Sequence, residues 1–85
     1  MISFISGNGT ARSDLVRTRI EAVHTLREAM VAFRQTAPHG RDYVGAEGQY
    51  EIDRKLFVER QQRLMALIAA VEEEAYALTQ IPGRP

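Results

Sequence analysis

The chain of 85 residues contains no cysteine and no tryptophan, and only two histidines and three prolines. Without cysteine it forms no disulfide bond and no cysteine-ligated zinc site, the staples on which many small domains depend. Its histidines, His24 and His39, lie in different predicted elements, and neither belongs to a His, Asp and Glu spacing that resembles a metal cage. No metal or other cofactor is therefore expected.

Long apolar runs and an excess of charge of one sign are also absent. The longest unbroken apolar run, Leu64 to Val71, is far shorter than the ~20 residues of a transmembrane helix. The 11 basic and 11 acidic residues balance, which argues against nucleic acid or an anionic membrane as a partner. The first six residues lack the basic region that opens a signal peptide. These absences predict a soluble protein of the cytoplasm.

Catalytic motifs are missing as well. The serines of the N-terminal region have no histidine nearby in the sequence, and no nucleophile elbow is present. Gly7-Asn8-Gly9 is a bare Gly-x-Gly with no strand before it, which is a very weak signal for phosphate binding. We therefore expect a protein that is not an enzyme.

What the chain does contain is two long apolar patterns of helical spacing. The first follows the Gly7-Asn8-Gly9 break, and it ends before Pro38 because the residue before a proline avoids the α region. Its apolar positions are Val16, Ile20, Val23, Leu26, Met30 and Phe33. The main stripe of the second is Ile52, Leu56, Phe57, Leu64, Leu67, Ile68, Val71, Ala75 and Leu78. These patterns predict an arm over residues 1–9, a hairpin domain over 10–81 with helices over about 13–37 and 49–79, and a tail over 82–85.

A loop over residues 38–48 is long enough for the two helices to fold back antiparallel. Because the middle of this loop lies near residue 43, contacting positions are expected to sum to about 86–90. This register places Phe33 near Leu56 and Phe57. It also places three arginines opposite the acidic run from Glu72 to Glu74, namely Arg12, Arg17 and Arg19. Val23 is expected near Leu64 and Leu67. The predicted fold is an all-α antiparallel two-helix hairpin.

A second apolar group on the later helix, Val58, Met65, Ala69 and Tyr76, lies well away from the main stripe. A hairpin covers only one side of this helix, and a chain of this size has a marginal core. We therefore expect self-association, most simply a homodimer that forms a four-helix bundle about a two-fold axis. The alternative is that these residues are ordinary scattered surface apolars.

Three charged residues, Arg19, Asp53 and Arg60, fall within the apolar stripes. An unpaired buried charge costs several kcal/mol, so such groups are either paired, extended to an edge or used by a ligand. Structural pairing is one reading. The other is a polar pocket between the helices in which Arg60 meets an anion.

The most site-like stretch is His39-Gly40-Arg41-Asp42-Tyr43, which joins an imidazole, a guanidinium, a carboxylate and a phenol. Arg41 is suited to grip a phosphate or carboxylate, His39 to donate a hydrogen bond, and Tyr43 to stack on a base or anchor a partner. The alternative is a loop held by its own Arg41–Asp42 contact, with Tyr43 folded over the hairpin end near Tyr50.

This stretch, followed by a charged helix, resembles in a general way short helical proteins of bacterial and phage genomes. In size and helical architecture the chain is also similar to phage anti-defence sponges, which trap cyclic nucleotides between helical hairpins. The likeness is one of shape, and it implies a nucleotide held between helices.

Two functions follow as hypotheses. The first is a self-associating interaction module that binds a partner protein through residues 38–50 and the exposed helix faces. The second is a binder of a nucleotide or another phosphate-bearing small molecule at an oligomer interface, using His39, Arg41, Tyr43 and Arg60. Nucleic-acid binding ranks third, because acidic residues interrupt the arginines of the first helix and the net charge is zero.

Overall fold

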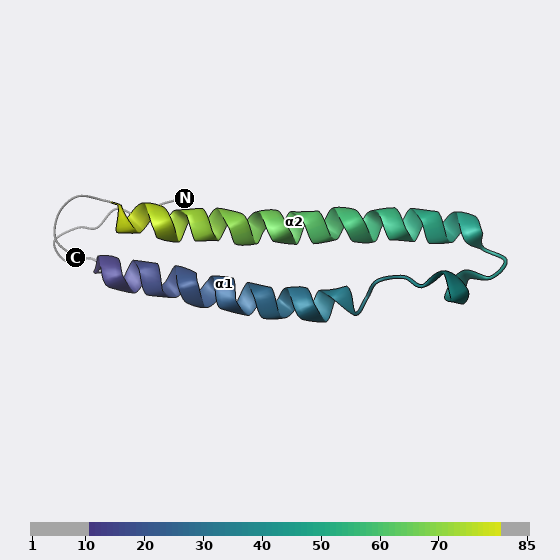
Figure 1. Ribbon diagram of the computed structural model, residues 1–85, viewed down its shortest axis with the longest axis horizontal. Helices are drawn as coiled ribbons and strands as arrows, with labels where there is room; N and C mark the ends of the chain where they lie inside the picture. The colour runs from purple at the N-terminus through teal and green to yellow at the C-terminus, as the bar shows by residue number, and fades with distance from the viewer. Residues whose placement is uncertain (1–10, 81–85) are drawn as a thin grey trace.

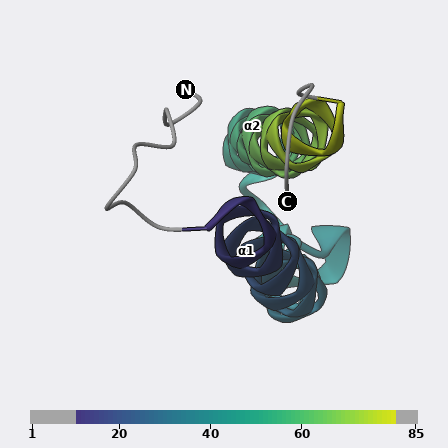
Figure 2. The same ribbon diagram turned by 90° about the vertical axis from the view of Figure 1, so that its left-hand side faces the viewer.

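The computed structural model describes residues 11–80, and the predicted arm and tail lie outside this range. Two α-helices, α1 (Arg12–Arg34) and α2 (Glu47–Thr79), are joined by a segment that contains one short 3-10 helix, η1 (Gly40–Tyr43). No strand occurs in the described part of the chain. The helices lie side by side and antiparallel, so the predicted all-helical hairpin is confirmed (Figures 1 and 2).

The longer helix, α2, extends past the end of α1 at the loop end of the hairpin (Figure 1). There the connecting segment, not α1, covers it, and η1 packs against the beginning of α2. The ring of Tyr43 lies 5.3 Å from that of Tyr50, as one of the two interpretations of the loop predicted. The segment therefore runs on alongside α2 beyond the end of α1, and the chain reverses in a turn over residues 43–46 that the Ala46 N–H closes by donating to the Tyr43 carbonyl (Figure 1).

Helix α1 ends at Arg34, three residues earlier than predicted. Beyond it the backbone N–H groups of Gln35, Thr36 and Ala37 bond to carbonyls three residues back, and the Thr36 hydroxyl donates to the carbonyl of Phe33. These bonds tighten the last turn and satisfy its free carbonyls, while Pro38 keeps Ala37 out of the helix.

Helix α2 begins at Glu47, two residues before the predicted boundary. Gly45 precedes it with φ of 83°, a left-handed conformation that glycine adopts without strain. The Ala46 carbonyl then accepts hydrogen bonds from the N–H groups of Gln49 and Tyr50, so the helix starts before its apolar pattern does.

The core is a narrow seam between the two helices. Only four apolar residues of the described chain are buried, namely Met30, Ile68, Ala75 and Leu78. Their half-buried neighbours are Val16, Val23, Leu26, Phe33, Phe57, Leu64 and Val71. On α2 the inward residues recur in alternating steps of three and four, the spacing that keeps one seam facing one partner helix.

The predicted stripes were therefore too wide. Ile20 on α1, and Ile52, Leu56 and Leu67 on α2, were expected in the core and are exposed. The physical reason is that a single partner helix covers only the narrow seam, whereas an apolar stripe of ordinary width needs neighbours on more than one side.

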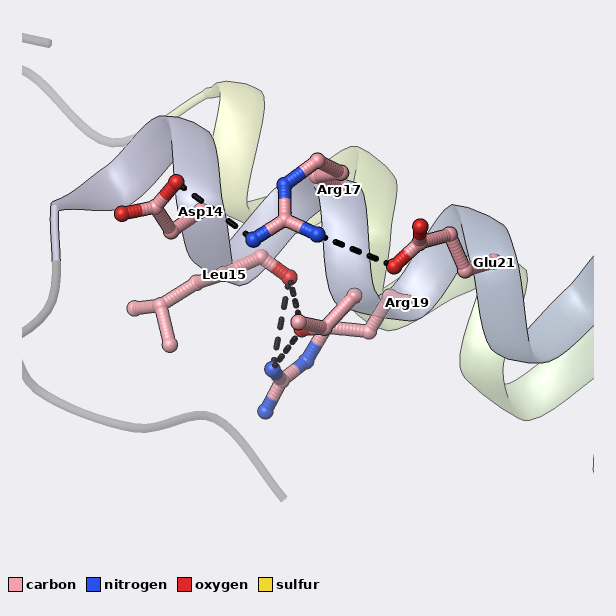
Figure 3. A network of polar contacts seen from close by, with 6 residues as sticks. Asp14, Leu15, Arg17, Arg19 and Glu21 are labelled. Atoms are coloured by element: carbon pink, nitrogen blue, oxygen red, sulfur yellow. Dashed lines mark hydrogen bonds and ion pairs between the residues drawn. The ribbon is translucent and has the colours of Figure 1, made fainter.

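The predicted register holds near the loop, where Phe33 stacks on Phe57 with ring centroids 5.0 Å apart and the two positions sum to 90. The Arg19 Nε donates to Glu74 over 3.1 Å, so this arginine does face the acidic run as predicted. Positions 19 and 74 sum to 93, however, so at this end of the hairpin the register lies beyond the predicted range of 86–90. For Arg17 the prediction was wrong, because its guanidinium contacts Asp14 and Glu21 on its own helix (Figure 3). Those carboxylates lie three and four residues away on one helix, so Arg17 reaches them without crossing the hairpin.

Candidate functional site

Two surface features have an organised set of side chains, and they lie on different sides of the hairpin. The first is a hollow of about 370 Å³ near the loop end. It opens where α1 has ended and the connecting segment covers α2. Its lining residues are Phe33, Thr36, Pro38, Tyr43, Asp53, Leu56, Phe57 and Arg60.

One wall of the hollow is a hydrogen-bonded group around Asp53. The Tyr43 hydroxyl donates to Asp53 Oδ2 over 2.8 Å, and Gln49 Nε2 donates to Oδ1 over 2.7 Å. The bond to Asp53, followed by partial desolvation and the charges of Asp53 and Asp42, raises the pKa of Tyr43 above its ordinary value. Both carboxylate oxygens of Asp53 thus have donors, so structural pairing accounts for this charge.

Arg19 is also paired, since it lies between the helices with its guanidinium on Glu74. It donates in addition to the carbonyl of Leu15 and the hydroxyl of Thr18 on its own helix (Figure 3). Arg60 differs from both. Its side chain lines the hollow, and within residues 11–80 it takes part in no hydrogen bond or ion pair.

Of the predicted loop residues, only Tyr43 reaches the hollow. His39, Arg41 and Asp42 are exposed and do not line it, and the alternative Arg41–Asp42 contact is not formed. The His39 carbonyl accepts the N–H of Asp42, which closes η1 and turns the three side chains away. The predicted set therefore separates into Tyr43 with Arg60 and three outward residues.

Sequence reasoning missed the contributions of Thr36, Pro38 and Gln49 near this hollow. The spacing of Gln49 and Asp53, four residues apart on one helix, was a usable signal. No sequence signal indicated that Thr36 and Pro38 would line the hollow, because their position depends on the path of the connecting segment.

The second feature is an apolar surface shared by both helices. Val58, Met65, Ala69 and Tyr76 are all exposed, and Tyr76 is 67% exposed. Met65 and Ala69 line a groove of about 380 Å³. The other residues of this groove are Arg27, Met30, Val31, Arg34, Ile68 and Glu72.

The groove shows that Val31 of α1 lies on the same side as the second apolar group of α2. Ile20 precedes Val31 by three helical turns and therefore shares its side of α1. Both are exposed. We call the six residues Ile20, Val31, Val58, Met65, Ala69 and Tyr76 the apolar face.

The groove at the apolar face also holds three charged residues, Arg27, Arg34 and Glu72, and two of them are paired. Arg27 forms an ion pair with Glu72 that crosses the groove from α1 to α2. Both side chains are about half exposed, so the pair adds little to stability and leaves the apolar residues open to a partner.

The part of the chain that the structure describes holds no group of three or more His, Asp and Glu side chains placed to bind a metal ion. Between residues 11 and 80, no helix combines the length and apolarity needed to cross a bilayer. Comparison of the chain with protein-family models, with curated proteins and with solved structures finds no match.

Proposed function

We propose that this chain is a non-catalytic, self-associating helical module, and that its apolar face binds a second copy to complete a four-helix bundle. The observation that carries the proposal is the surface that one hairpin leaves exposed. Large apolar side chains on both helices face the same side, and a single seam buries only four residues within residues 11–80.

The magnitude of this exposure is consistent with a dimer. The chain exposes 6513 Å², whereas a compact protein of its size is expected to expose about 5,100 Å². The surplus of about 1,400 Å² is similar to what each chain buries in an obligate dimer, where the total is about 2,000–5,000 Å².

The test uses light scattering with circular dichroism. Met65→Glu or Tyr76→Glu puts a charge into the apolar face, so we expect a dimer for the parent chain and helical monomers for both variants. Leu67→Glu is the matched control, because Leu67 is exposed on the same helix but lies off the face. If both face variants keep the mass of the parent chain, the proposed interface is wrong.

We also propose that the same module binds a partner protein through residues 38–50, as the sequence predicted. What supports it is Val44, which is 86% exposed between η1 and α2 and whose side chain is open to a partner. Val44→Asp tests it. A cellular binder that is retained by the parent chain should be lost from this variant while self-association is unchanged.

A second function, small-molecule binding, is favoured by the state of Arg60. Arg60 is exposed, and its guanidinium, which has no protein partner within residues 11–80, lines the hollow together with the rings of Phe33 and Phe57. We propose a monocarboxylate with an apolar body as the ligand, because one arginine matches one planar carboxylate. The nearby charge of Asp53 disfavours a doubly charged phosphate.

The probe for this second function is 3-phenylpropionate, with its uncharged amide and adenosine monophosphate as comparisons. Nuclear magnetic resonance titration should give saturable shifts at Arg60 and Phe57 with the carboxylate alone. Arg60→Gln should abolish them, and Arg63→Gln, three residues along the helix and outside the hollow, should not. Shifts with the nucleotide instead would favour the phosphate ligand of the original hypothesis.

A further inference from the structure

The six residues of the apolar face are arranged symmetrically along the hairpin, and this arrangement defines the dimer. On α2 they stand at positions 58, 65, 69 and 76, with gaps of seven, four and seven residues. This spacing reads the same in both directions about position 67. An antiparallel copy of α2 placed with its own position 67 at the same level therefore meets every apolar residue with an apolar residue.

Helix α1 has the same centre of symmetry. Its two members of the face, Ile20 and Val31, are centred between positions 25 and 26. The contacts Arg19–Glu74 and Phe33–Phe57 fix which levels of the two helices lie side by side. Halfway between these contacts, position 26 of α1 lies beside positions 65 and 66 of α2. The two centres thus coincide to within about 3 Å along the axis.

We infer that a two-fold axis crosses the hairpin at this level, so that α2 packs antiparallel on α2 of a second copy and α1 on its α1. This inference rests on the proposed self-association and specifies its geometry. The axis pairs Val58 with Tyr76 of the second copy, and Met65 with Ala69. Each contact joins a larger side chain to a smaller one, which is how facing layers interdigitate.

The polar positions on this seam of α2 are complementary as well. Gln62 and Glu72 occupy the remaining seam positions and are also centred on position 67. The axis therefore places the Gln62 amide of one chain opposite the Glu72 carboxylate of the other. An amide N–H donates to a carboxylate, whereas two carboxylates at this place repel one another.

The alternative axis, parallel to the helices, packs α1 on α2 of the second copy. It pairs Ile20 and Val31 with residues of α2 and leaves the symmetric spacing within each helix without a cause. The perpendicular axis accounts for the apolar spacing of both helices at once.

Cysteine cross-linking tests the axis directly, because the chain has no cysteine of its own. Val58→Cys chains mixed with Tyr76→Cys chains should form a disulfide-linked heterodimer on oxidation. Val58→Cys alone should remain unlinked. Its two sulfurs stand eighteen residues apart along the bundle, about 27 Å, which is far beyond the reach of a disulfide.

A second measurement exchanges the polar pair. Gln62→Glu should weaken the dimer at least tenfold by placing it against Glu72, and adding Glu72→Gln should restore the affinity. Glu72→Gln alone removes the exposed ion pair with Arg27 and leaves two uncharged amides facing each other across the dimer, so it should weaken the dimer less than Gln62→Glu does.

The outcomes separate the two proposals. A monomeric parent chain overturns the self-association and the axis with it. A dimer in which the mixed cysteine variants stay unlinked, or in which the exchanged pair does not recover, overturns the axis and leaves the self-association standing.

Discussion

The three isoleucines within residues 11–80 provide one chemical change in three environments. Ile68 is 6% exposed in the seam, Ile52 is 54% exposed off the apolar face, and Ile20 is 57% exposed on it. Replacement by alanine deletes the same atoms each time. Differences among the three variants therefore report the surroundings and not the residue.

At Ile68 the deletion leaves a cavity in the core. Such changes cost about 2–5 kcal/mol, and the narrow seam has few side chains that can move in to fill the space. Ile52→Ala should change stability by less than about 0.5 kcal/mol, because its small loss of contacts is offset by the higher helix propensity of alanine.

At Ile20 we expect the alanine substitution to weaken dimerisation and to leave the stability of the single hairpin nearly unchanged. Burying a whole isoleucine side chain is worth about 1.5–3 kcal/mol, so its exposed 57% contributes about 1 kcal/mol when a second copy covers it. A two-fold interface uses the residue twice. The loss of about 2 kcal/mol per dimer raises the dissociation constant about thirty-fold.

The assays are sedimentation equilibrium for the dissociation constant and urea unfolding, followed by circular dichroism at several chain concentrations. Unfolding of a dimer depends on concentration, so the Ile20→Ala penalty should be absent where both chains are monomeric and should rise to a plateau as concentration rises. Equal dissociation constants for Ile20→Ala and Ile52→Ala would refute the assignment of the apolar face. An Ile68→Ala cost as small as that of Ile52→Ala would refute the seam.

Three further predictions concern the connecting segment and the pairing of the helices. Tyr43→Phe removes the hydrogen bond to Asp53, so unfolding should become easier. Because folding raises the pKa of Tyr43, the stabilisation from this hydrogen bond is fully present below about pH 10 and is lost as the pH rises through the raised pKa. The unfolding free energies of the parent chain and Tyr43→Phe should therefore converge when both are measured at increasing alkaline pH. Gly45→Ala should destabilise the chain by about 1 kcal/mol because Gly45 has a positive φ, whereas Gly48→Ala, in the first turn of α2, should stabilise it by about 0.5–1 kcal/mol. Neither new methyl group meets another atom within 4 Å, so backbone conformation alone sets the two signs, and thermal unfolding measures them. Arg19→Met should lower the midpoint of urea unfolding by removing one donor from its partly buried carboxylate partner, and by more than the loss of an exposed ion pair such as that of Arg17 with Glu21.

The sequence predicted the helices and their hairpin because local rules govern them. Three- and four-residue apolar steps, the breaks at glycine and proline, and a loop long enough to reverse the chain all act over short distances. The stacking of Phe33 on Phe57 followed from these rules, since it depends only on where the chain reverses.

The candidate site was predicted less well. Tyr43 and Arg60 were brought to one hollow, but His39, Arg41 and Asp42 were not. A run of polar residues in sequence indicates a surface loop, yet the direction of each side chain depends on the turn that the loop adopts. The 3-10 helix decided that direction.

The sequence alone determined that this chain forms two amphipathic helices with more apolar surface than one partner helix covers. Only the tertiary structure decided which apolar residues remain outside, and that those of α1 and α2 lie on one side at one level. The physical reason is that periodicity is a property of a single helix, whereas the seam and its register arise from how two helices and the segment between them share a limited area of contact.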